Sequence, residues 1–287
     1  ITFQPSEIAK LGLIMFLAFC LEQHHKGVVG KIPSDLGVCR FVENASNGKY
    51  VIYKSFTSTI AYGFFILLFA VLVLIENHVS GAVLMLAIGV IMLFLGEVKN
   101  KWFIVGVVVA VFAVILFVMN PDLLKEYAGE RIVAWLDKDY KPLGARWQIN
   151  NSLYAIGSGG FLGTGLGQSK QKHLYVSEPQ NDFIFSIVCE ELGFVGATAI
   201  ILLFALLVYR GIKIGLRAKD RFGALLAMGI VFQVGVQVAL NIAVVSDFIP
   251  NTGISLPFFS YGGTSLVILL CEMGIILSIS RSARKKD

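Results

Sequence analysis

Three carboxylates stand close together in the stretch VSEPQNDFIFSIVCEELGFVGA, which begins at Val176. Asp182 directly precedes the apolar run Phe183 to Phe185, and Glu190 and Glu191 follow before the chain becomes wholly hydrophobic. A carboxylate that is partly removed from water binds a proton more readily, which suits a general base. Asp182 is therefore a candidate catalytic base. An aspartate in this position also caps a helix N-terminus, and the residues alone leave both interpretations open.

Other polar side chains lie inside apolar segments. Lys10 follows Glu7 by three residues, and Glu272 interrupts the run LLCEMGIIL. Charges at membrane depth are costly, which makes Lys10 and Glu272 candidates for function. A stripe of amides recurs every four residues: Gln233, Gln237 and Asn241. Interhelical hydrogen bonding is favoured over ligand contact for this stripe. Glu190 and Glu191 either mark the start of a membrane span or face a polar cavity.

Two segments rich in glycine or proline flank these groups. The segment GARWQINNSLYAIGSGGFLGTGLGQS, from Gly144, lacks the preceding strand that a dinucleotide-binding loop needs. The segment DFIPNTGISLPFFSYGGTSL, from Asp247, directly precedes the last apolar run. Irregular backbone at membrane depth is tolerated where it is buried or lines a cavity, so this segment is expected to form a wall of the site. The four histidines show no metal-ligand spacing.

The elements that position these residues are expected to be membrane helices. Hydrophobic residues make up 56% of the chain and charged residues 15%, with a mean hydropathy of +0.76, whereas about a quarter of a soluble domain is charged. The expected fold class is all-α, a polytopic membrane helix bundle with seven spans. The expected spans are Ile8 to Leu21, Phe56 to Ile75, Val79 to Leu95, Trp102 to Met119, Phe183 or Leu192 to Tyr209, Phe222 to Val245, and Thr264 to Ser280.

The distribution of Lys and Arg predicts the orientation of these spans, because short cytoplasmic loops are enriched in both. Four segments carry 5, 2, 5 and 4 of them: Gln23 to Ser55, Glu97 to Lys101, Arg210 to Arg221, and Arg281 to Asp287. The connection Ser246 to Ser260 carries none. The basic segments are therefore expected in the cytoplasm and the connection 120–182 outside, as a large loop. This asymmetry explains the net charge of +5, and no nucleic-acid site is expected.

Several motifs together resemble the SEDS family of membrane glycosyltransferases, which includes FtsW, RodA and SpoVE. The motifs are FQPSEIAKL from Phe3, GSGGFLGTGLGQSKQK from Gly157, EPQNDFIFSIVCEELGF from Glu178, and PNTGISLPFFSYGGTSL from Pro250. The resemblance covers essentially the whole chain, 1–287, as one membrane domain that contains the loop 120–182. The family has ten spans, so this chain is expected to supply spans four to ten and to lack an N-terminal part. The motifs favour the FtsW and SpoVE branch.

The resemblance implies an enzyme, a peptidoglycan glycosyltransferase that polymerises lipid II and releases undecaprenyl pyrophosphate for cell division or related wall synthesis. The acid that family members require corresponds to Asp182. Contacts with the substrate are expected from Glu7, Lys10, Arg146, Gln148, Lys172, Glu178, Ser260, Gly262 and Gly263. Lys10, Arg146, Lys172 or a divalent cation (Mg or Mn) would stabilise the departing pyrophosphate.

The resemblance also implies partners and a location. A class B penicillin-binding protein and other division or elongation proteins are the expected partners. The expected location is the cytoplasmic membrane of a bacterium, with the active site facing outside. The chain departs from the family pattern at ENHVSGA (Glu76 to Ala82), and Asp247, Phe248 and Asn251 stand where smaller or apolar residues are more usual.

Two other functions stay open: a lipid-linked precursor flippase and a non-catalytic cell-wall scaffold. Intramembrane charges and broken helices also suit a transporter. The enzyme is favoured because a polymerase needs its decisive residues on the outer side, where the longest and most feature-rich loop is expected.

Overall fold

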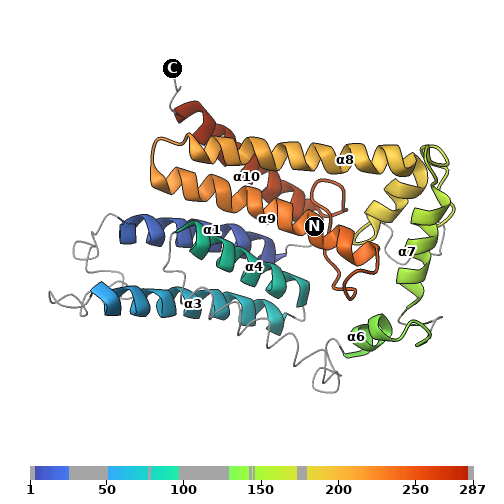
Figure 1. Ribbon diagram of the computed structural model, residues 1–287, viewed down its shortest axis with the longest axis horizontal. Helices are drawn as coiled ribbons and strands as arrows, with labels where there is room; N and C mark the ends of the chain where they lie inside the picture. The colour runs from blue at the N-terminus through green and yellow to red at the C-terminus, as the bar shows by residue number, and fades with distance from the viewer. Residues whose placement is uncertain are drawn as a thin grey trace. The chain divides into compact units, whose positions relative to one another are not determined.

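A computed structural model describes residues 4–25, 51–76, 79–96, 129–141, 144, 146–172 and 180–283. All regular elements in these ranges are helices (Figure 1). In chain order they are α1 (Pro5–His25), α3 (Val51–Ile75), α4 (Val79–Leu95), α6 (Gly129–Leu136), α7 (Trp147–Ser158), α8 (Ile184–Leu216), α9 (Arg221–Val245) and α10 (Gly263–Ser282). The predicted all-α fold class is confirmed over this part of the chain.

Six of the described helices coincide with predicted membrane spans, whereas α6 and α7 lie in the predicted loop 120–182. Three of them, α8, α9 and α10, are long and apolar enough to cross a membrane. The helix α4 and the described part of α3, Ala61–Ile75, are shorter apolar helices. Each of α1, α3, α4, α8, α9 and α10 contains one predicted span, while the predicted span Trp102 to Met119 lies outside the described residues.

The chain divides into two compact units. The first comprises Ile1–Gln4, Ala113–Arg210 and Gln233–Cys271, and the second comprises Pro5–Phe112, Gly211–Phe232 and Glu272–Asp287. In the second unit α1, α3 and α4 pack against one another (Figure 1). A β-carbon added to Gly89 of α4 would lie 2.5 Å from the Ile66 side chain of α3, so the two helices approach closely.

In the first unit the backbone of α8 is interrupted two residues after its paired glutamates. Gly193 has φ 64° and ψ −168°, which a helix does not allow. A β-carbon on Gly193 would lie 2.2 Å from the Gly163 nitrogen, and one on Gly163 would lie 2.1 Å from the Glu191 carbonyl oxygen. The segment that follows α7, residues 159–172, is called the glycine-rich segment. It therefore packs directly against the backbone of α8, a contact that only glycine permits.

Candidate active site

Asp182 lies two residues before α8 begins, and its main chain is fixed by a helix distant in sequence. Asn241 of α9 is fully buried. Its side-chain amide donates hydrogen bonds to the Asp182 carbonyl oxygen at 2.8 Å and to the Ile254 carbonyl oxygen at 2.6 Å. One buried amide thus joins the candidate acid to the connection between α9 and α10.

The α9–α10 connection, residues 246–262, holds the two residues before Asp182 as well. The Tyr261 amide donates to the Gln180 carbonyl oxygen at 2.8 Å, and the Ser260 hydroxyl donates to the Asn181 carbonyl oxygen at 2.7 Å. The Asp182 carboxylate itself lies beside Gly253, where an added β-carbon would be 3.1 Å from Oδ2. The expectation that this connection forms a wall of the site agrees with its contacts along residues 180–182.

A buried ion pair joins the same connection to the residue that precedes α7. The Arg146 guanidinium bonds both carboxylate oxygens of Asp247, with one contact of 3.3 Å, and both side chains are at least nine-tenths buried. Arg146 also donates to the Ala134 carbonyl oxygen at 2.8 Å. Trp135 of α6 donates from its indole nitrogen to the Asp247 carbonyl oxygen at 3.2 Å. Two helices of the long connection are therefore anchored at Asp247.

The helix α7 makes two further bonds, one to the last residue of α9 and one to the connection that follows it. The Ser152 hydroxyl donates to the Val245 carbonyl oxygen at 2.8 Å, and the Asn251 side-chain amide donates to Gln148 Oε1 at 3.1 Å. The predicted substrate residue Gln148 therefore has a hydrogen-bond partner inside the protein. Its contact with a substrate stays a prediction.

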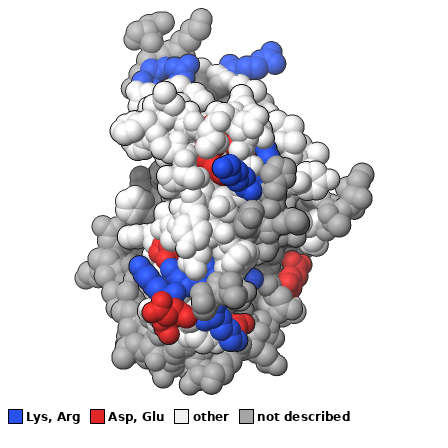
Figure 2. Space-filling view, turned by 90° about the vertical axis from the view of Figure 1, so that its right-hand side faces the viewer, with Lys and Arg blue, Asp and Glu red and all other residues white. Residues whose placement is uncertain are grey.

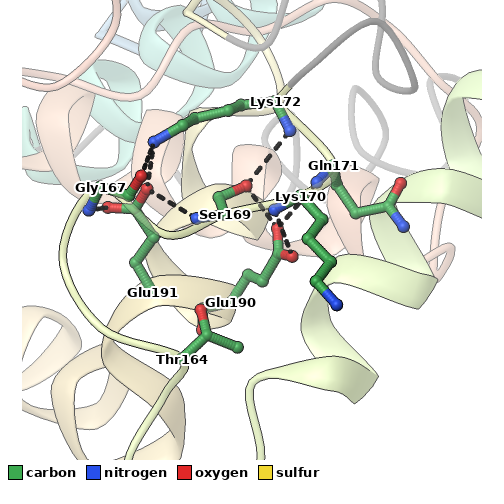
Figure 3. A network of polar contacts seen from close by, with 8 residues as sticks. All are labelled: Thr164, Gly167, Ser169, Lys170, Gln171, Lys172, Glu190 and Glu191. Carbon is green, nitrogen blue, oxygen red and sulfur yellow. Dashed lines mark hydrogen bonds and ion pairs between the residues drawn. The ribbon is translucent and has the colours of Figure 1, made fainter.

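Glu190 and Glu191 bind the glycine-rich segment, as Figure 3 shows. Glu190 is buried and accepts hydrogen bonds from the Ser169 hydroxyl at 2.5 Å and from the Lys170 amide at 2.9 Å. Glu191 accepts from the Gly167 amide at 2.9 Å and forms an ion pair with the Lys172 ammonium at 2.9 Å. A protein segment supplies the polar partners that these two glutamates require.

The backbone of α8 continues this docking on both sides of the Gly193 break. The Thr164 and Gly165 amides donate to the carbonyl oxygens of Glu190 and Glu191, at 2.9 and 3.0 Å. The Phe194 amide in turn donates to the Gly160 carbonyl oxygen at 2.9 Å. The break frees backbone groups of α8, and the glycine-rich segment satisfies them.

The three cations predicted to stabilise the departing pyrophosphate each contact a carboxylate. Lys10 pairs with Glu7 at 2.8 Å in the second unit, Arg146 pairs with Asp247, and Lys172 pairs with Glu191. Lys172 is the most accessible of the three, with its side chain 28% exposed against 4% for Lys10 and 3% for Arg146.

The remaining predicted substrate residues occupy the end of the α9–α10 connection or lie outside the described ranges. The Ser260 hydroxyl accepts from the Leu256 amide at 2.6 Å as well as donating to Asn181. The Gly262 carbonyl oxygen accepts a hydrogen bond from the Leu266 amide at 3.1 Å, in the first turn of α10, which begins at Gly263. Glu178 is outside the described residues. Of the predicted substrate-binding residues, Ser260 thus contacts the backbone of Asn181, the residue next to Asp182.

The sequence interpretation missed three residues around Asp182. Asn241 was expected to pack rather than to serve the site, yet it contacts the main chain of Asp182. Gly253 and Asn251 carried no predicted role. Asn251 nevertheless stood out as a departure from the family pattern, and Asn241 as the end of an amide stripe, so both signals were present in the sequence.

A divalent cation at the site stays a prediction. In the described part of the chain no group of three or more His, Cys, Asp or Glu side chains lies close enough to hold one. A Mg²⁺ or Mn²⁺ ion assists many phosphate-releasing reactions.

Charged side chains on the face shown in Figure 2 gather mainly in its lower part, with acidic and basic groups intermixed. Lys141 and Glu130 of α6 form an exposed ion pair at 2.6 Å. Several large apolar side chains of the glycine-rich segment are exposed: Phe161, Leu162 and Leu166. Such side chains suit contact with a membrane interface.

The sequence matches known proteins along its length. A family model described as a cell cycle protein, of the FtsW, RodA and SpoVE group, matches residues 1–285. Stage V sporulation protein E of Bacillus subtilis (strain 168) is 36% identical over 287 residues, which cover 99% of this chain and 70% of that protein. The probable peptidoglycan glycosyltransferase FtsW of Geobacter sp. (strain M18) is 38% identical over 283 residues, which cover 98% and 69% of the two chains.

Solved structures share the fold. A chain of a peptidoglycan synthase complex, studied for its coordination of polymerization and crosslinking, superimposes with a TM-score of 0.71 at 24% identity, covering 100% of this chain and 72% of the other. The crystal structure of the Thermus thermophilus rod shape determining protein RodA gives a TM-score of 0.60 at 24% identity, covering 100% and 68%.

Proposed function

This chain belongs to the FtsW, RodA and SpoVE family, and from that membership we propose that it is a peptidoglycan glycosyltransferase that polymerises lipid II into glycan strands. The observation that carries the proposal is the setting of Asp182, the acid that the resemblance assigns to catalysis. Residues 180–182 are bonded one after another to the α9–α10 connection or to α9. A catalytic group needs this kind of fixed geometry.

The chain lies in the cytoplasmic membrane of a bacterium, with Asp182 on its outer side. The helix α9 supports this orientation, because the basic segment Arg210 to Arg221 leads into one end of it. The connection Ser246 to Ser260, without Lys or Arg, follows its other end. Basic loops remain in the cytoplasm. The connection that contacts Asp182 is therefore outside, in reach of a lipid-linked sugar of the outer leaflet.

Asp182 acts as the general base. Its carboxylate accepts the proton of the GlcNAc 4-hydroxyl of one lipid-linked disaccharide while that oxygen attacks the anomeric carbon of MurNAc on the other glycan. The new bond joins O4 to the anomeric carbon, and the bond from that carbon to the pyrophosphate oxygen breaks. The electron pair leaves with undecaprenyl pyrophosphate, and a single displacement of this kind inverts the anomeric centre.

Lys172 is the best placed of the predicted cations to stabilise the leaving pyrophosphate. Its ammonium is the most exposed of the three and lies on the segment that docks on α8, within the same unit as Asp182. Two of the three donors of this ammonium bond the Gly167 carbonyl oxygen at 2.6 Å and Glu191 at 2.9 Å. A phosphate would take the third donor or displace one of these two partners. Arg146 is buried in its ion pair with Asp247 and is therefore the weaker candidate for binding the pyrophosphate.

A class B penicillin-binding protein is the partner that this activity requires, since the polymerised strands need a transpeptidase to cross-link them. The exposed apolar faces of α8 and α10 offer surface for a membrane-anchored partner helix. A similarity of fold to a chain of a peptidoglycan synthase complex supports this arrangement.

The proposal is tested with the purified protein, its partner and fluorescent lipid II in vesicles, assayed for glycan strands by gel electrophoresis. Polymer from the unchanged protein and none from Asp182→Ala is the expected result. Asp139→Ala is the matched control, because Asp139 is an exposed aspartate of the same long connection, and it should polymerise normally. Movement of lipid II across the vesicle membrane without polymer would instead identify a flippase, and neither movement nor polymer would leave only the scaffold.

A further inference from the structure

Two residues at which this chain departs from the family pattern, Asp247 and Asn251, make specific contacts with the long connection. Asp247 pairs with Arg146, and Asn251 bonds Gln148. We propose that Arg146, Asp247 and Asn251 form a loop clamp that positions Gly253, and through it the Asp182 carboxylate, for catalysis. The loop clamp rests on the proposed glycosyltransferase function, because its members act on the acid of that reaction and not on the substrate.

The ion pair fixes the beginning of the α9–α10 connection. Asp247 has φ 58°, in the left-handed region that side chains other than glycine, asparagine and aspartate rarely adopt. The pair is almost wholly buried, and Arg146 has a further bond to Ala134. A buried arginine that bonds both oxygens of a carboxylate holds it in one orientation. The backbone at residue 247 is therefore set by the segment that leads into α7.

Asn251 transmits this constraint to the site. Its Nδ2 donates to Gln148 of α7 at 3.1 Å, and its Oδ1 accepts the Gly253 amide at 3.2 Å. Gly253 has φ 72° and is the residue whose added β-carbon would lie 3.1 Å from Asp182 Oδ2. The sequence of contacts from α7 to the acid is thus Gln148, Asn251, Gly253 and Asp182.

The loop clamp acts on a different part of the site from Asn241. Asn241 holds the main chain of Asp182 from inside the membrane bundle, whereas the loop clamp places the wall beside its carboxylate from the long connection. A wall that moves by an ångström changes the position of the base relative to the attacking hydroxyl. Displacements of that size reduce turnover by up to about a hundredfold without removing any catalytic group.

The first test replaces both members of the ion pair by neutral side chains of similar size. Arg146→Met and Asp247→Asn singly leave a buried charge without its partner and are expected to lower the unfolding temperature. The double variant removes both charges and keeps a residue that tolerates φ 58° at position 247. It is expected to unfold near the temperature of the parent, with kcat lowered on the order of tenfold and KM for lipid II unchanged. A double variant with the kcat of the parent would overturn the proposal.

The second test needs only Asn251 and does not depend on the fate of the ion pair. Asn251→Asp keeps the acceptor for the Gly253 amide, whereas Asn251→Ala loses it. Asn251→Ala is expected to lower kcat with KM unchanged. Asn251→Asp is expected to retain a higher kcat than Asn251→Ala. Phe248→Ala is the control, because Phe248 is the third departure residue but is 77% exposed, and its kcat should equal that of the parent. Equal kcat values for the alanine and aspartate variants would contradict a role through Gly253.

Hydrogen–deuterium exchange separates the failure of this inference from a failure of the proposed function. The amides of residues 249–255 are expected to exchange faster in the double variant and in Asn251→Ala, whatever reaction the protein catalyses. Exchange identical to the parent in both variants would overturn the loop clamp. Absence of polymer from the parent protein together with faster exchange in the variants would instead overturn the lipid II reaction and leave the loop clamp standing.

Discussion

The side-chain amide of Asn241 donates one hydrogen bond to the carbonyl oxygen of Asp182, at 2.8 Å, and its second to the carbonyl oxygen of Ile254, at 2.6 Å. Both amide protons of a fully buried side chain are used on main-chain acceptors. The segment that carries the acid and the wall that faces it are therefore fixed by the same group, and a change at residue 241 displaces both.

Asn241→Leu is expected to lower both stability and turnover. The substitution leaves the buried Ile254 carbonyl oxygen and the partly buried Asp182 carbonyl oxygen without their donor, which costs about 1–3 kcal/mol for the buried one and less for the other. Gln237→Leu is the matched control, since Gln237 lies one turn earlier on α9 and donates to the Ser255 carbonyl oxygen at 3.0 Å, whereas Asn241 donates to the main chain of Asp182. Thermal unfolding and initial polymerisation rates should show similar destabilisation in the two variants but a larger loss of kcat in Asn241→Leu. The same loss of kcat in both would argue against a special role of residue 241.

Gly253→Ala is expected to reduce activity more than its effect on stability explains. A left-handed backbone costs about 1–2 kcal/mol for a residue with a β-carbon, and the added methyl would lie 3.1 Å from Asp182 Oδ2. Gly167→Ala carries the same backbone strain, with φ 78°, but its methyl would have no heavy atom within 4 Å. Comparable unfolding temperatures with kcat reduced only in Gly253→Ala would locate the effect at the carboxylate. Equal kcat values would show that only backbone strain matters.

The membrane helices could be predicted from the sequence because each apolar run is about long enough to cross a bilayer. The predicted span Val79 to Leu95 has the same bounds as α4, and Phe222 to Val245 begins one residue inside α9. The start of α8 was harder to predict, because Glu190 and Glu191 indicated two alternatives. The helix begins at Ile184 and contains both glutamates, since the glycine-rich segment supplies their hydrogen-bond donors.

The site could be predicted only in part, because its geometry depends on contacts between residues distant in the sequence. The local sequence identified Asp182 as a carboxylate beside an apolar run. Nothing local indicates that Arg146 would meet Asp247, or that Asn251 would meet Gln148, since the two pairs are separated by 101 and 103 positions in the sequence. For this reason the sequence alone suggested Arg146 as a cation that stabilises a phosphate, whereas the structure shows it buried against a carboxylate.

Glu190→Ala is expected to release the glycine-rich segment from α8. Glu190 is buried and accepts from the Ser169 hydroxyl and from the Lys170 and Gln171 amides, at 2.5, 2.9 and 3.4 Å. Unpaired buried donors cost about 1–3 kcal/mol each, so the segment should open locally. Hydrogen–deuterium exchange should increase over residues 164–172. Lys172→Met, which removes a more exposed partner, should increase it less. Unchanged exchange in Glu190→Ala would mean that the main-chain bonds suffice.

Gly193→Ala is expected to prevent folding of the first unit. The β-carbon of alanine would lie 2.2 Å from the Gly163 nitrogen and 2.7 Å from the Phe161 and Leu162 carbonyl carbons, all of which are main-chain atoms that cannot rotate away. The residue would also have to keep φ 64° at the break of α8. Overpacking of this severity costs more than the roughly 1–3 kcal/mol of ordinary core insertions.

Gly157→Ala is the control, because its β-carbon would meet no heavy atom within 4 Å, and an alanine inside α7 should stabilise the helix by about 1 kcal/mol. Accumulation of folded protein in the membrane, measured by fluorescence-detected size-exclusion chromatography, should be lost in the first variant and kept in the second. Normal accumulation of Gly193→Ala would show that the glycine-rich segment does not need its close contact with α8.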